Sequence, residues 1–109
     1  GPAAGEAVKP VAGYLTSKRV QERRAALKVL AKIGVASGAA LGDGHSGIVA
    51  CLQDQDAEVR AEAAHCLKRI DKAARRADIK QLLEPLLKDP DEGVRRATQG
   101  AWEKLFTGA

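Results

Sequence analysis

The chain has 109 residues, of which 45% are hydrophobic and 29% are charged, so its size and composition suit one globular domain. It contains one Trp, one Tyr and one Phe, and its two Cys are too few for the disulfide scaffold of a small secreted module. No apolar run approaches the roughly 18 residues that a membrane span needs, so we expect no membrane insertion. The formal net charge of +4 is only a mild basic excess. We expect an intracellular, reducing compartment, the cytoplasm ahead of the nucleus.

The N-terminal residues differ in character from the rest of the chain. Gly1 and Pro2 resemble the scar left when a protease removes an expression tag, and the sequence contains no Met. We therefore expect residues 1–5 to be a disordered scar. Residues 6–109 are expected to form a single repeat domain that belongs to a larger protein.

An internal repeat organises this domain. Leu15, Leu52 and Leu87 are 37 and 35 residues apart, and each is followed eight residues later by an arginine. The alignment creates columns that recur at helical spacing: Arg23, Arg60 and Arg95; Ala26, Ala63 and Thr98; Leu30, Leu67 and Trp102; Ile33, Ile70 and Leu105. Spacings of three and four residues describe one face of a helix, so each repeat is expected to end in an amphipathic helix.

The sequence predicts three helical hairpins in chain order, at about 6–33, 45–76 and 78–107. In each hairpin a shorter apolar helix precedes a polar turn and the longer amphipathic helix. Residues 34–44 contain four Gly and are expected to be a mobile linker, with Gly34 capping the preceding helix. Residues 71–78 are expected to extend the second amphipathic helix, with Asp78 capping the next helix. Pro85 should bend that helix.

Two turn motifs resemble HEAT repeats. Asp-Gln-Asp-Ala-Glu-Val-Arg at 54–60 and Asp-Pro-Asp-Glu-Gly-Val-Arg at 89–95 are each followed by Ala and apolar residues at helical spacing. The resemblance covers nearly the whole chain and implies an all-α fold, a right-handed α-solenoid of three HEAT-like hairpins. It also implies a structural ladder, in which turn aspartates bond to helix arginines across repeats: Asp54, Arg60, Asp89 and Arg95. The first repeat has Ser17 at the aspartate position, so its rung should be weaker.

The exposed columns of the amphipathic helices are basic. Partner-binding residues are expected among Arg24, Lys32, Arg69, Arg96 and Lys104. A positive stripe on the concave face of a solenoid could bind an acidic segment of another protein. The alternative is a solvated helix flank, on which basic residues suit the helix dipole. We expect a non-catalytic scaffold segment that binds a protein partner and is monomeric or weakly self-associating.

Residues 16–27 also resemble the opening of TOG domains, the tubulin-binding subclass of HEAT proteins. That resemblance implies tubulin as an alternative partner, bound through the turn residues Lys18 and Arg19. The sequence departs from the TOG pattern because Val20 stands where TOG domains carry Trp. The later turns are also acidic, whereas an acidic partner such as tubulin needs basic ones.

Other functions have less support in the sequence. Some HEAT-like proteins bind nucleic acid or are bilin lyases, but the net charge is low and no aromatic platform is exposed in the predicted columns. His65 and Cys66 are adjacent on a helix and point about 100° apart, so they do not converge as a catalytic pair. Neither Cys51 nor Cys66 lies in a metal-binding spacing. We therefore expect no catalytic residue, no metal and no cofactor.

Overall fold

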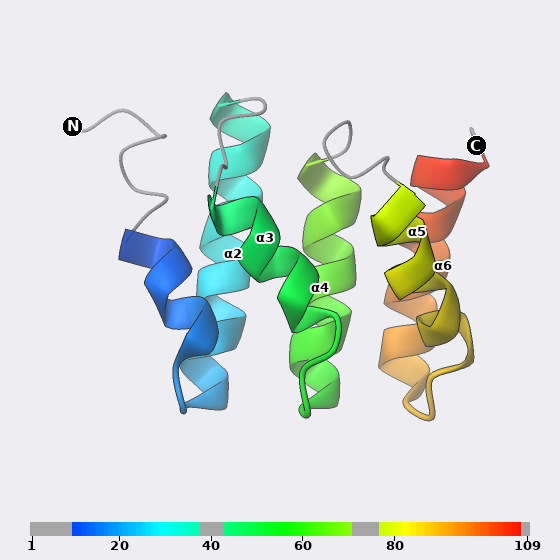
Figure 1. Cartoon of the computed structure of the whole chain (residues 1–109), viewed down its shortest axis with the longest axis horizontal. Coiled ribbons are helices and arrows are strands. Elements are labelled where there is room, and N and C mark those ends of the chain that lie inside the picture. The colour runs from blue at the N-terminus through cyan, green and yellow to red at the C-terminus, as the bar shows by residue number, and fades with distance from the viewer. Residues whose placement is uncertain (1–9, 38–42, 71–76, 108–109) are drawn as a thin grey trace.

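The computed structural model consists of three helical hairpins that stand side by side (Figure 1). It describes residues 10–37, 43–70 and 77–107, and these contain no β-strand. The hairpins are built from these elements in chain order: η1 (Gly13–Thr16) and α2 (Val20–Ser37); α3 (Asp43–Cys51) and α4 (Ala57–Ile70); α5 (Ala77–Leu83), η3 (Glu84–Lys88) and α6 (Glu92–Phe106). The all-α solenoid predicted from the repeat is confirmed.

The hairpins form two layers. The long helices α2, α4 and α6 make one layer, and η1, α3 and the α5–η3 segment make the other (Figure 1). The molecule is accordingly a slab of 40 × 32 × 18 Å. Helix α4 lies in the middle of its layer and packs against both α2 and α6. Helix α4 therefore makes the main contacts between the long helices of neighbouring hairpins.

Apolar periodicity explains why the long helices form and pack where they do. In α4 the side chains of Val59, Ala63, Cys66 and Leu67 are at most 1% exposed. They recur at three- and four-residue spacing, which places them on one side of a helix. The buried residues of all three hairpins join one hydrophobic cluster that runs from Leu15 to Leu105. In the described part of the chain the three hairpins share this cluster, as expected for a repeat that buries its apolar face against its neighbours.

The first inter-hairpin linker differs from the prediction. Helix α2 continues through Gly34 to Ser37, and α3 begins at Asp43, so the predicted helix cap at Gly34 is wrong. A glycine inside a helix costs only about 1 kcal/mol relative to alanine, which is too little to end a helix that is otherwise well packed. Residues 38–42 lie outside the described part of the chain, as do the predicted scar at 1–5 and the junction at 71–76.

The third hairpin shows the effect of its proline. Helix α5 ends at Leu83, and the chain continues as the 3-10 helix η3 with Pro85 in its first turn. Proline lacks the backbone N–H that an α-helix interior requires, and the α-helix gives way to a 3-10 helix at the position where the sequence predicted a local bend. Asp78 lies within the first turn of α5, which begins at Ala77, rather than preceding it as a cap.

Candidate functional site

A network of arginines and aspartates joins the hairpins at their intra-repeat turns. Arg23 on α2 donates from Nε and Nη2 to the two carboxylate oxygens of Asp54, at 2.8 and 3.1 Å. Asp54 lies in the turn of the next hairpin, between α3 and α4. Its carboxylate is therefore held by a bidentate pair that crosses the first inter-repeat junction, the stronger geometry for an arginine and a carboxylate.

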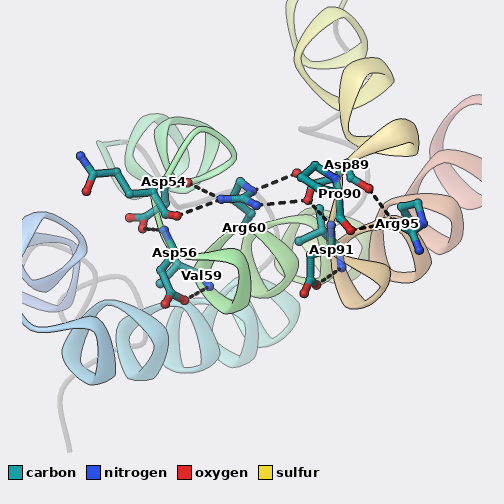
Figure 2. A network of polar contacts seen from close by, with 10 residues as sticks. Asp54, Asp56, Val59, Arg60, Asp89, Pro90, Asp91 and Arg95 are labelled. Carbon is teal, nitrogen blue, oxygen red and sulfur yellow. Dashed lines mark hydrogen bonds and ion pairs between the residues drawn. The ribbon is translucent and has the colours of Figure 1, made fainter.

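The same geometry recurs at the second junction. Arg60 donates from Nε and Nη2 to Asp89 at 3.0 and 3.1 Å, and its Nη1 donates to the carbonyl oxygens of Asp54 and Gln55 (Figure 2). Each arginine thus contacts its own turn through backbone carbonyls and the next turn through a carboxylate. Asp54, Arg60 and Asp89 are brought together as the ladder requires.

The first rung has the same pairing geometry as the second. The Arg23 pair matches the Arg60 pair in distance, because the carboxylate comes from the following repeat. Ser17 contributes only its carbonyl oxygen, which accepts a hydrogen bond from Arg23 Nη1 at 2.8 Å. The serine at position 17 therefore does not remove the arginine–aspartate pair at the first junction, and the weaker rung expected in the first repeat stays a prediction. The column of aligned arginines contained the signal that Arg23 belongs to the ladder.

Arg95 is the open end of this network. Its Nη1 donates to the carbonyl oxygens of Asp89 and Pro90, at 2.7 and 3.0 Å, which repeats the inward half of the Arg60 geometry. Among the described residues, no carboxylate forms a hydrogen bond with its other guanidinium nitrogens, and Figure 2 shows Arg95 beside the turn that contains Asp89 and Pro90. Arg95 consequently lacks the cross-repeat half of a rung within the described part of the chain.

The turn aspartates have inward-facing structural roles. Asp56 and Asp91 cap the long helices by accepting from the backbone N–H of Val59 and Val94, at 3.0 and 2.9 Å. Asp54 and Asp89 each accept a further bond from the backbone N–H two residues on, in addition to their arginine. Because Asp54 and Asp89 are also paired with arginines, these two carboxylates add less negative charge to the turns than the sequence indicates.

The hydrogen bonds of the network shift the pKa values of its charged side chains. Desolvation acts to raise the pKa of Asp89, but the hydrogen bonds from Arg60 and from the Asp91 backbone prevail, so the pKa lies below its ordinary value of 3.8. The hydrogen bond to Asp89 correspondingly raises the pKa of Arg60, and the bond to Asp54 raises the pKa of Arg23. All three groups are therefore charged at neutral pH.

The long-helix face carries a groove between α2 and α4. Four basic side chains line it, namely Lys28, Lys32, His65 and Arg69. The lining also includes the carboxylate of Glu62 and, at the floor, the small side chains of Ala31 and Cys66. Lys32 and Arg69, two of the predicted partner-binding residues, are both exposed and line this groove. Lys28 and His65 were not predicted, although both lie one turn before them on the same helices.

The other predicted partner-binding residues have contacts within the protein. Arg24 forms an ion pair with Glu58 across α2 and α4, and Arg96 pairs with Glu92 within α6 at 2.9 Å. Lys104 Nζ donates to the carbonyl oxygen of Lys68 at 2.8 Å, which satisfies an acceptor near the end of α4. The structure thus does not bring all five residues together as one unoccupied stripe.

The alternative turn residues lie at the start of the first long helix. Lys18 and Arg19 are exposed, with 79% of the Arg19 side chain accessible. Arg19 Nη1 lies 3.8 Å from a carboxylate oxygen of Glu22. The two residues form a small basic turn, with no counterpart in the turns that contain Asp54 and Asp89.

The two cysteines are unpaired thiols in the core. Burial raises the pKa of Cys51 to about 11 and that of Cys66 to about 12. A nucleophilic cysteine needs the thiolate near neutral pH, so both thiols are in the unreactive protonated form. In the described ranges, no group of three or more His, Cys, Asp or Glu side chains is arranged to hold a metal ion. None of the described helices is both long and apolar enough to cross a membrane.

The fold and its turn network define a class of protein, the α-solenoids built from repeated helical hairpins. Residues 46–101 match the family model of HEAT repeats, which covers half of the sequence. The chain belongs to the HEAT repeat family. HEAT repeats generally act as protein-interaction scaffolds and are typically non-catalytic.

A solved structure supports the same assignment. The crystal structure of an engineered protein superposes with a TM-score of 0.73 and 27% sequence identity, over 98% of this chain and 53% of that chain. The chain therefore spans about half the length of that engineered protein. No curated protein matches the sequence significantly.

Proposed function

We propose that this chain is a non-catalytic binding segment that takes an acidic stretch of another protein into the groove between α2 and α4. The observation that carries the proposal is the shared position of Lys32 and Arg69. Both are exposed, line one groove and come from adjacent hairpins. A single hairpin cannot offer this surface, whereas stacked hairpins can.

The composition of the groove favours a protein segment with both acidic and apolar residues. Lys28, Lys32 and Arg69 surround a floor to which Ala31 and Cys66 contribute, and Glu62 is the one carboxylate in the lining. Carboxylates of a partner would pair with the cations, which gives orientation and a faster encounter. Apolar side chains of the partner would lie against the floor. Two buried free thiols suit an intracellular, reducing compartment for this interaction.

The charge distribution along the long helices indicates which part of them binds the acidic partner. Near the intra-repeat turns, Arg24 is neutralised by Glu58 and Arg96 by Glu92. The groove residues Lys32 and Arg69 lie further along their helices, away from those turns, and have no ion pair with a described residue. We therefore place the partner across the half of α2 and α4 that follows Lys28 and His65.

A titration tests this proposal. The isotope-labelled chain is titrated with a short synthetic peptide of alternating Glu and Leu, and amide shifts are followed by NMR. We expect the largest shifts around Lys32 and Arg69. The double variant Lys32→Glu/Arg69→Glu should weaken binding by about tenfold or more, since about 1.4 kcal/mol corresponds to a factor of ten. Because both side chains are exposed, the melting temperature should change little.

The matched control is Lys18→Glu/Arg19→Glu, which makes the same change in net charge at the basic turn. This control should bind like the unmodified chain. If the control pair loses binding and the groove pair does not, the turn is the binding surface. Titration with soluble tubulin then tests the TOG-like alternative, for which Lys18 and Arg19 are the expected contacts.

A further inference from the structure

The first hairpin exposes a face whose counterparts are buried or partly buried in the other two. Val29 is 42% exposed, whereas its aligned residues Cys66 and Ala101 are 1% and 0% exposed. Tyr14 is 54% exposed, and its counterpart Cys51 is 5% exposed. In the later hairpins this face is covered by the preceding hairpin. None of the described residues covers it in the first.

This face is an apolar hollow with one acidic side chain. Its lining is aliphatic and aromatic apart from Glu22: Val11, Tyr14, Glu22, Ala25, Ala26 and Val29. Tyr14 and Val29 are the large hydrophobic residues that stand exposed among the described side chains. An apolar patch of this kind on the surface of a soluble protein commonly marks an interaction site.

The second hairpin shows what kind of element covers such a face. Helix α2 packs against α4 there, with Leu27, Leu30 and Ala31 at most 3% exposed. Arg23, four residues before Leu27, bonds to Asp54 at the turn. The covering element is thus a helix that carries an arginine and has aliphatic or small residues four, seven and eight residues after that arginine.

The turn of the first hairpin offers a similar acceptor. Ser17 Oγ accepts from the backbone N–H of Arg19 at 3.1 Å, as the carboxylate of Asp54 accepts from the backbone N–H of Asp56. The Ser17 hydroxyl also donates to a carboxylate oxygen of Glu22. A carboxylate therefore lies beside this turn although the aspartate is missing.

The α6 side of a second copy of the chain does not supply the complementary surface. At the other end of the solenoid, the residues aligned with Leu27 and Ala31 are Gln99 and Glu103. Both are exposed, and they bond to each other at 3.0 Å. Stacking this end on the hollow would bury polar groups against Val29 and Tyr14, which is unfavourable unless each finds a new partner.

We propose that the hollow of the first hairpin binds an amphipathic helix of another protein, with an arginine at one end that pairs with Glu22 and an aliphatic stripe that covers Tyr14 and Val29. In this arrangement the partner helix packs against the first hairpin as α2 packs against the second hairpin. This surface lies on the side of the first hairpin that faces away from the second, and its occupation does not depend on the groove between α2 and α4.

The test uses the full chain and a synthetic peptide with the sequence of residues 20–37, which supplies the arginine and the aliphatic stripe. The labelled chain is titrated with the peptide and monitored by NMR. We expect shifts centred on Tyr14, Ala25 and Val29. Val29→Glu in the chain should weaken binding by about tenfold or more, a change that an apolar contact replaced by a charge readily produces. Gln21→Glu, also exposed on α2, is the matched control and should have little effect.

A charge exchange checks the role of Glu22. Glu22→Lys should weaken binding of the unmodified peptide, and a peptide with glutamate in place of Arg23 should restore it. Shifts confined to the α6 end, or equal binding by the Val29→Glu and Gln21→Glu variants, would overturn the proposal. Self-association of the unmodified chain in sedimentation equilibrium that Val29→Glu abolishes would also overturn it, because the occupant would then be a second copy.

Discussion

Bidentate arginine and aspartate pairs connect neighbouring hairpins through side chains that are largely buried. The Arg60 and Asp89 side chains are 16% and 6% exposed, so solvent screens this pair less than a surface ion pair. Asp89 also accepts the backbone N–H of Asp91. Removal of one partner would leave the other charge poorly solvated, which is the costly event in such a network.

Arg60→Ala is therefore expected to lower the free energy of unfolding by about 1–3 kcal/mol, as for loss of a charged hydrogen-bond network. Arg95→Ala is the matched control. Arg95 aligns with Arg60 but donates only to carbonyl oxygens among the described residues, so its replacement should cost less than half as much. Urea denaturation of both variants measures the difference. Equal losses would show that the carboxylate half of the rung contributes nothing.

The Asp89 pKa gives this network a pH dependence. Because the folded-state pKa is lowered, Asp89 contributes stability above its unfolded pKa of about 3.9, and this contribution is lost as the pH falls through the folded-state value. We expect the unfolding midpoint to fall more steeply below about pH 4 in the unmodified chain than in Asp89→Asn. Denaturation midpoints between neutral and acidic pH measure this. Parallel curves for the two proteins would exclude Asp89 as a source of acid sensitivity.

At the scale of the element, a glycine in α3 determines how closely two short helices of the same layer approach each other. A Cβ atom added at Gly47 in α3 would lie within van der Waals overlap of Leu15 Cδ1, at 2.5 Å, and Leu15 is 4% exposed. Gly47 therefore permits α3 to approach the 3-10 helix η1 of the preceding hairpin. At Gly13 in η1, by contrast, no atom lies within 4 Å of an added Cβ.

Gly47→Val should consequently destabilise the chain by about 1–3 kcal/mol, the usual cost of inserting atoms into a packed interior. Gly13→Val adds the same atoms where there is open space, and its effect should stay within about 0.5 kcal/mol. Thermal or urea unfolding of the pair provides the comparison. A neutral Gly47→Val would mean that Leu15 can move without loss of packing.

The sequence was sufficient to predict the elements that depend on local patterns. Periodic apolar columns predicted the long helices, and Pro85 predicted where the α-helix of the third hairpin is interrupted. The end of α2 was not predictable from Gly34, because packing outweighs the modest helix penalty of one glycine. The exposed basic columns likewise could not reveal that Lys104 bonds to the Lys68 carbonyl or that Arg24 pairs with Glu58. Those contacts depend on the distance and rotation between neighbouring hairpins.

At the scale of the whole molecule, one continuous core joins all three hairpins. The cluster includes Leu15 in the first hairpin, Leu67 in the second and Leu105 in the third. Helix α4 is packed on both sides. Since the described parts of the three hairpins share this core, the loss of one hairpin would expose apolar surface on its neighbour. The stability of the molecule therefore depends on the junctions between hairpins.

We expect the chain to unfold in a single transition. Trp102, the one tryptophan, lies in α6 and reports on the third hairpin, whereas far-ultraviolet circular dichroism reports on all helices. The urea midpoints from tryptophan fluorescence and from circular dichroism should coincide, which is the standard test of two-state behaviour. Leu67→Ala in the central helix should lower both midpoints together, at a cost of about 2–5 kcal/mol. Separate midpoints would show that the third hairpin unfolds independently.

Because both cysteines are buried in the central hairpin, thiol labelling can measure how often this hairpin opens. Cys51 and Cys66 are 5% and 1% exposed and keep their protons near neutral pH, so a thiol reagent cannot modify them in the closed molecule. Labelling must wait for a fluctuation that brings a thiol into solvent. When reclosing is faster than labelling, the observed rate is the rate of a free thiol multiplied by the open fraction. The difference in labelling rate between the two cysteines would then compare how often the short helix α3 and the long helix α4 expose their buried sides.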